Sequence, residues 1–117
     1  MGRRVSDGRS ARVTVPASTT IEQGSFAYIG GILGYAPVAV KTGAGETKEA
    51  ILVHEMAEYE TSQINTSEAF AKGAKVYWDD TNKRFTTTAT DNRFAGIVTS
   101  AKDANNVIWF IFQPDLA

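Results

Sequence analysis

The chain has 117 residues, a length that allows one small domain, and 43% of them are hydrophobic, as in a folded protein. It contains no cysteine, which excludes disulfide bonds and thiolate metal sites. The net charge of −1 is unevenly spread, because residues 1–12 hold four arginines against one aspartate. No apolar run is long enough to span a membrane, and none follows the first arginines as a signal peptide would require.

The N-terminal segment, residues 1–20, is predicted to be a flexible basic arm ahead of a single β domain at residues 21–117. Its four arginines are Arg3, Arg4, Arg9 and Arg12. The arm is either a solvated tail or a segment that orders on the acidic surface of a partner. Because the arginines are not interleaved with aromatic residues, we expect no direct contact with nucleic acid. Residues 12–15 alternate and stop at Pro16, as an edge or arm strand would.

The pattern after the arm is typical of β-strands. Residues 26–29 and 32–35 flank two glycines at 30–31, which favours a two-residue hairpin because its turn needs positive φ. We expect the second of these strands to continue through Pro37 as far as Val40. Residues 43–46 should then form the next turn.

A long extended stretch follows at residues 47–59. Its apolar alternation breaks near His54 and Glu55, which predicts a β-bulge or the passage of the chain from one sheet to another. Helix is the competing interpretation for residues 49–60, and strand is favoured.

The rest of the chain is predicted to alternate strands with turns. Residues 61–72 are polar and hold at most one short helical turn near 67–71, with Ser67 as its N-cap. Four further strands are separated by turns rich in Asp and Asn: residues 75–78, 84–87, 94–99 and 107–112. These short, punctuated strands predict an all-β fold, either a small β-barrel or a β-sandwich.

The last strand is apolar on both faces. A strand with water on one face should alternate apolar with polar side chains, and this one does not. Either the segment 61–72 folds over the second face or a neighbouring subunit covers it. The second alternative proposes self-association through five side chains: Val107, Trp109, Phe110, Ile111 and Phe112.

No catalytic, cofactor or metal site is predicted, and we therefore expect no enzyme. His54 is the only histidine, so a hydrolase built from it with Glu55 or Glu58 would depend on one residue. Residues 41–48 resemble a phosphate loop only superficially, because no Gly-Lys-Ser/Thr run begins a helix there. Residues 79–82 lack the glycine and the distal glutamate of a calcium loop.

The order of these elements resembles a known family. The likeness runs from about Gly24 to Phe112 and rests on five stretches: Gly24 with Tyr28–Ala36, Gly45–Glu46, Ala71–Asp79, Thr87–Thr90 and Gly96–Val98. The most specific of them is the Gly-x-x-Val-Tyr-Trp-Asp run at 73–79, followed by the threonines. The chain thus resembles the small phage proteins described as capsid cement or decoration proteins.

The resemblance implies attachment to the outer surface of an assembled phage head, where the protein would stabilise contacts between coat subunits. Its partner would then be the major capsid protein, and the arginines of the arm would contact it. It would be made in the cytoplasm of the bacterial host and would not bind a membrane. Cyclic symmetry suits such a role, and we expect a homotrimer at a local three-fold axis of the shell. The alternative function is a small β-barrel module that binds carbohydrate or nucleic acid.

Overall fold

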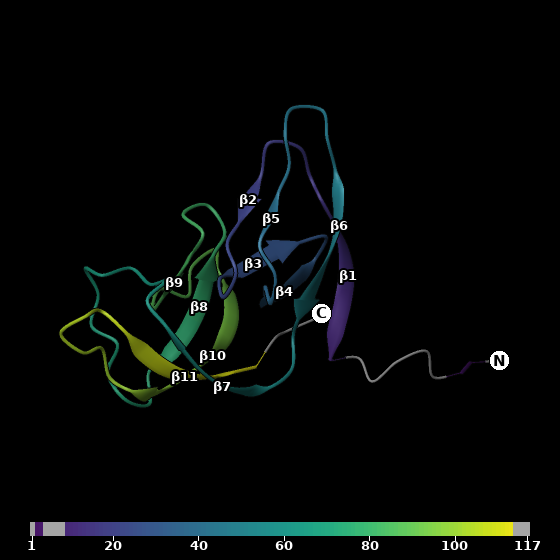
Figure 1. Ribbon diagram of the computed structural model, residues 1–117. Coiled ribbons are helices and arrows are strands. Elements are labelled where there is room, and N and C mark those ends of the chain that lie inside the picture. The colour runs from purple at the N-terminus through teal and green to yellow at the C-terminus, as the bar shows by residue number, and fades with distance from the viewer. Residues whose placement is uncertain (1, 4–8, 114–117) are drawn as a thin grey trace. The chain divides into compact units, whose positions relative to one another are not determined.

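The computed structural model describes residues 2–3 and 9–113, and within these the chain is all β, without a helix (Figure 1). The predicted fold class is confirmed. The chain forms two compact units, residues 1–55 and 56–117. The strands are β1 Ser10–Val15, β2 Thr20–Ile21, β3 Phe26–Ile29, β4 Ile32–Tyr35, β5 Val40–Lys41, β6 Lys48–Val53, β7 Ala57–Thr61, β8 Lys75–Asp79, β9 Arg84–Thr86, β10 Arg93–Ser100 and β11 Ile108–Phe112.

The first unit contains a four-stranded antiparallel sheet in the order β1-β6-β4-β3 and a two-stranded ribbon of β2 and β5 (Figure 1). Because side chains alternate along a strand, β1 turns Val13 and Val15 inward and Arg12 and Thr14 outward. Five of the buried residues form a cluster: Val13, Val15, Ile21, Ala36 and Leu52.

Strand β1 confirms the strand predicted at residues 12–15 and begins two residues earlier. It pairs with β6 along its whole length, from Ser10 opposite Val53 to Val15 opposite Lys48. The predicted division into an arm and one domain stays a prediction, although residues 10–15 of that arm lie in the sheet.

The predicted hairpin is present between β3 and β4. Its two central residues, Gly30 and Gly31, have φ of +59° and +83°, which glycine adopts without strain. The predicted continuation of β4 to Val40 is wrong, because the strand ends at Tyr35. Pro37 lacks the N–H that a ladder needs, and β5 pairs with β2 instead.

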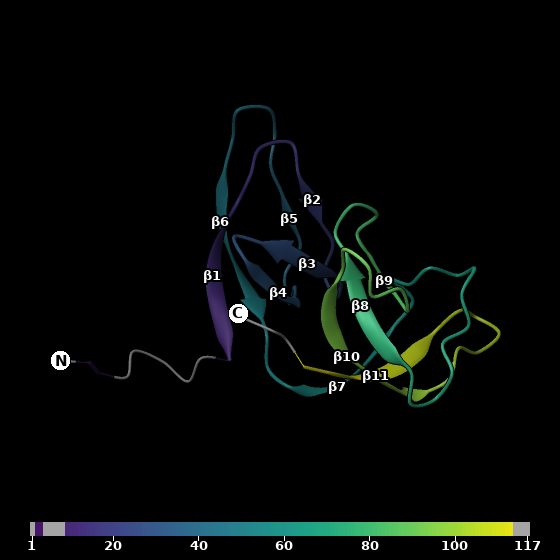
Figure 2. The ribbon, with the colours of Figure 1, turned by 180° about the vertical axis from the view of Figure 1, so that it is seen from behind.

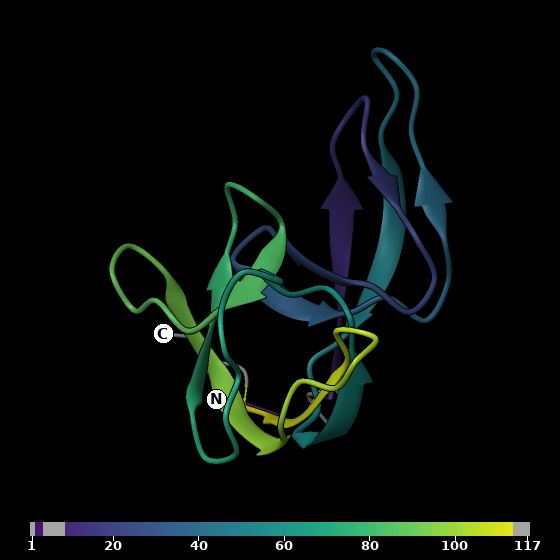
Figure 3. The same cartoon turned by 90° about the vertical axis from the view of Figure 1, so that its left-hand side faces the viewer.

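The second unit contains a five-stranded antiparallel sheet in the order β7-β11-β10-β8-β9. This sheet curls into a half-barrel, as Figure 3 shows, and β10 and β8 lie side by side in it (Figure 2). The inner face carries the core, in which the ring of Phe85 lies 5.0 Å from those of both Trp78 and Phe110. Ile64 and Phe70, from the segment between β7 and β8, are also buried.

The break in alternation near His54 marks the passage of the chain from one sheet to another. β6 ends at Val53 in the sheet of the first unit, and β7 begins at Ala57 in the sheet of the second. The helix considered for residues 49–60 is therefore wrong.

The short helical turn considered near 67–71 is absent. Asn65, rather than Ser67, caps a tight turn there, since its side-chain oxygen accepts the Ser67 N–H over 3.1 Å and its backbone oxygen accepts the Glu68 N–H over 3.1 Å.

Candidate interaction surfaces

Strand β11 has one buried and one exposed face. It lies between β7 and β10, and Phe110 and Phe112 on its inner face are fully buried. On its outer face Trp109 is 49% exposed and Ile111 is 39% exposed. Val107 precedes the strand and is partly buried. Of the five side chains predicted for self-association, only Trp109 and Ile111 are thus exposed.

The segment 61–72, one of the two predicted covers, does not lie over Trp109 and Ile111. The buried residues of the segment 61–72, Ile64 and Phe70, contribute to the core, and Ile64 bridges to Phe85 of β9. The inner side of the strand is apolar because it builds the core. The outer side forms an apolar patch that is exposed to solvent. Exposed apolar patches of this kind mark contact sites.

We define the outer face by six exposed side chains from four neighbouring strands: Glu58, Glu60, Lys75, Ile97, Trp109 and Ile111. Residues directly opposite each other on adjacent strands point to the same side of a sheet. Glu58 lies opposite Ile111, Ile111 opposite Ile97, and Ile97 opposite Lys75. These four residues therefore form one row across β7, β11, β10 and β8.

Hydrogen bonds hold the acidic edge of this face in place. Glu58 accepts a hydrogen bond from the Thr99 hydroxyl over 2.6 Å. Glu60 accepts one from the indole N–H of Trp109 over 3.2 Å. These bonds fix the carboxylates beside apolar side chains instead of leaving them free in solvent. The geometry suits a contact whose apolar centre has charge at its rim.

The first unit presents a second surface, around the arginines of the predicted arm. Arg12 lies directly opposite Ile51 on β6, and Ile51 is 51% exposed. Arg9 comes just before β1 and forms an exposed ion pair with Glu55 at 3.8 Å. We call Arg9, Arg12 and Ile51 the arginine face. Arg3 is exposed, and Arg4 lies outside the described residues.

No catalytic constellation accompanies these surfaces in the part of the chain that the structure describes. His54 is partly buried, and no group of three potential metal ligands exists among the described residues. Within the same residues, no helix is long and apolar enough to cross a membrane.

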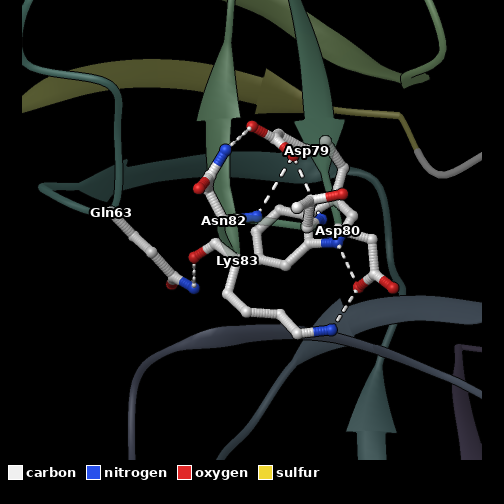
Figure 4. Close-up of polar contacts among 7 residues, drawn as sticks. Gln63, Asp79, Asp80, Asn82 and Lys83 are labelled. Carbon is white, nitrogen blue, oxygen red and sulfur yellow. Dashed lines mark hydrogen bonds and ion pairs between the residues drawn. The ribbon is translucent and has the colours of Figure 1, made fainter.

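The acidic hairpin between β8 and β9 is stabilised by its own residues (Figure 4). Asp79 accepts hydrogen bonds from the backbone N–H groups of Thr81 and Asn82 and, over 2.7 Å, from the Asn82 side chain. The bonds from Asn82 lower the pKa of Asp79 below its usual 3.8. Asp80 bonds to Lys83 over 2.9 Å and to the Trp78 indole over 3.1 Å. The turn predicted between the strands at 75–78 and 84–87 is confirmed, and it joins β8 and β9 into a hairpin.

Comparison with known protein families decides between the remaining interpretations. A model of the phage cement protein family matches residues 5–112, which is nearly the whole chain. The chain belongs to the phage cement protein family. No curated protein and no solved structure matches it.

Membership confirms the resemblance seen in the sequence and gives this cement protein a capsid-associated, structural role in the virion. The family is not a class of enzymes. A cement protein acts through contact surfaces, so the outer face and the arginine face are its candidate sites.

Sequence reasoning missed the charged members Glu58, Glu60 and Lys75 of these faces and also their two isoleucines, Ile51 and Ile97. Ile51 alternates with the buried Leu52, and Ile97 with the buried Val98. The sequence signal for these two isoleucines is that each lies in a strand with apolar residues on both faces. Only the last strand was predicted to have two apolar faces.

Proposed function

We propose that this cement protein binds the exterior of the assembled head through the major capsid protein and stabilises contacts between coat subunits. It would be made in the cytoplasm of the bacterial host and add to the head from outside. The observation that supports this function best is the pairing of Arg12 with the exposed Ile51 on the outer side of β1 and β6.

An exposed isoleucine beside an arginine can contribute both burial of apolar surface and electrostatic attraction to binding. Burial of Ile51 against a coat subunit would remove apolar surface from water, at roughly 25 cal/mol per Å². Arg12, with Arg9 and Arg3, would add attraction to an acidic coat surface and speed the encounter. Many copies on one shell multiply such small contacts, so each contact can be weak.

Self-association through the exposed Trp109 and Ile111 is part of the proposal. Phe110 and Phe112 contribute to it only indirectly, because they hold β11 in the core of the second unit. The homotrimer expected from the sequence stays a prediction, and light scattering on the purified protein measures it.

The test uses phage heads that lack the protein. Purified wild type, Arg12→Glu and Ile51→Ser are each added to heads, and bound protein is quantified after sedimentation. We expect both variants to bind at least about tenfold more weakly, which corresponds to about 1.4 kcal/mol. The binding of Arg12→Glu should also depend less on salt than that of the wild type.

Lys72→Glu serves as the control. It makes the same reversal of charge at an exposed residue that belongs to the second unit and not to the arginine face. Equal occupancy by wild type, Arg12→Glu and Ile51→Ser would refute the assignment of this surface. Heads that release DNA at the same temperature with and without bound protein would refute the stabilising role.

A further inference from the structure

The row across the outer face runs from an acidic to a basic end. Glu58 lies at one end, Lys75 at the other, and Ile111 and Ile97 lie between them. Neighbouring strands are about 4.8 Å apart, so the row spans about 14 Å. Both isoleucines are more than a third exposed, at 39% and 37%.

This order of residues is complementary to itself. If a second copy is turned by a two-fold axis that is parallel to the strands and passes between β11 and β10, the row is reversed. Glu58 then faces Lys75 of the second copy, and Ile111 faces its Ile97. A two-fold contact uses the same patch on both copies, so both ion pairs form at once.

We propose that the outer face joins two copies of this protein through a two-fold contact centred on Ile97 and Ile111. Trp109, the most exposed aromatic side chain of β11, lies two residues from Ile111 on the same face and would be buried in the contact. Tryptophan is enriched among the residues that contribute most to protein interfaces. The pair, rather than a trimer, is the state that this face favours.

The charges of the outer face favour a second copy of this protein over a nucleic acid as its binding partner. Glu58 and Glu60 border the apolar centre and would repel the phosphates of a nucleic acid. The curl of the sheet brings its central strands, β10 and β11, to the crest of the outer side (Figure 3). The two isoleucines would therefore meet first, and the longer Glu58 and Lys75 side chains can reach across at the rim.

The decisive experiment mixes two charge-reversed variants. Glu58→Lys carries positive charge at both ends of the row, and Lys75→Glu carries negative charge at both ends. Each alone would place like charges opposite each other, so we expect its dimer to dissociate at least about tenfold more readily than that of the wild type. In an equimolar mixture every facing pair has opposite charge, and dimers should form again.

Sedimentation velocity on the free, full-length protein measures these states over a range of concentrations. The double variant Glu58→Lys/Lys75→Glu should dimerise like the wild type, because both pairs are restored with their signs exchanged. Lys72→Glu, outside the row, should leave the dimer unchanged. Trp109→Ser should weaken dimer formation when it is added to the wild type, to the two single variants in the mixture or to the double variant.

Two results would overturn the inference. One is a wild type that is monomeric throughout or trimeric whatever the charges at 58 and 75. The other is a mixture of the two single variants that stays monomeric while both remain folded by circular dichroism. The inference rests on the free protein and not on head binding, so its failure would leave the proposed attachment to heads untouched.

Discussion

Glu68 accepts a hydrogen bond from the hydroxyl of Thr86 over 2.7 Å and so ties the segment between β7 and β8 to the end of β9. The same carboxylate accepts the Thr87 N–H over 3.0 Å and the Thr88 hydroxyl over 3.1 Å. Lys102 donates to the backbone oxygen of Glu68 over 2.7 Å. The threonine run, noted in the sequence only for its family resemblance, is thus a set of partners for one carboxylate.

This network predicts that stability falls in acid. Burial alone raises the pKa of Glu68, but the hydrogen bonds from Thr86, Thr87 and Thr88 outweigh it, so the pKa lies below the usual 4.5. The folded state then binds fewer protons than the unfolded chain. Its stabilisation is complete above about pH 4.5 and is lost as the pH falls through the folded pKa.

Glu68→Gln should remove this part of the acid sensitivity. Because Glu68 is only partly buried, solvent reduces the contribution of these bonds, and we expect the variant to lose about 1 kcal/mol of unfolding free energy at pH 7. Urea unfolding followed by tryptophan fluorescence at pH 7 and in acid measures both effects. Glu22→Gln, an exposed carboxylate of the first unit, is the control. Parallel acid curves for wild type and Glu68→Gln would contradict the prediction.

Two strand glycines are required by close packing of the backbone. A Cβ at Gly96 would overlap the backbone oxygen of Ile111 on the neighbouring strand. A Cβ at Gly34 would lie 2.9 Å from the Leu52 Cβ and 2.9 Å from the Val53 oxygen. Neither neighbour is the end of a flexible side chain, so the strands themselves would have to move.

We therefore expect Gly96→Ala and Gly34→Ala each to destabilise the fold by about 1–3 kcal/mol in chemical unfolding. Gly43→Ala is the matched control, because its added Cβ would come no closer than 3.8 Å, to the flexible Glu46 side chain. Without a close contact, Gly→Ala should if anything stabilise, because alanine lowers the entropy of the unfolded chain. A cost for Gly43→Ala equal to that for Gly96→Ala would therefore contradict the assignment of these losses to close packing.

The two faces of β11 should respond differently to truncation. Phe110 is fully buried and packs on Phe85 with ring centres 5.0 Å apart, so Phe110→Ala should cost about 3–5 kcal/mol. Trp109→Ala removes a half-exposed ring and one exposed hydrogen bond and should cost about 1 kcal/mol or less. Thermal unfolding at a concentration that keeps the protein monomeric separates the two, and similar losses would show that the outer side of the strand is also covered.

Local chemistry explains why part of this fold could be predicted. The Gly30–Gly31 turn needs positive φ at both residues, and the break near His54 follows from the change of sheet, so both can be identified within a few neighbouring residues. The extension of β4 to Val40 failed because the partner of β5 is β2, a two-residue strand some twenty positions earlier. Pairings at such separations depend on the whole fold rather than on local preference.

The candidate surfaces could be predicted only in part for a similar reason. Trp109 and Phe110 are both large aromatic side chains, and nothing in their identity tells which one faces the core. The curl of a sheet assembled from β7, β10 and β8 decides it. Charge was more informative at the arm, where Arg12 proved to be on the outward side of β1.

A buried threonine connects the two loops that extend from the first unit, and its removal gives the last prediction. The hydroxyl of Thr42 donates to the Pro16 backbone oxygen over 2.6 Å and accepts the Thr19 N–H over 2.9 Å. Thr42 is 3% exposed, and its own N–H donates to the Thr19 oxygen over 2.9 Å. The hydroxyl therefore satisfies two backbone groups from the connection between β1 and β2.

Thr42→Val keeps the shape of the side chain but leaves both backbone groups without that partner, so we expect a loss of about 1–3 kcal/mol in unfolding free energy. The more specific readout is amide exchange, because the Thr19 N–H should lose its protection. Thr42→Ser keeps the hydroxyl and should keep that protection, even though the lost methyl group weakens packing. If the Thr19 amide exchanged equally fast in both variants, the methyl group and not the hydroxyl would be what holds these loops together.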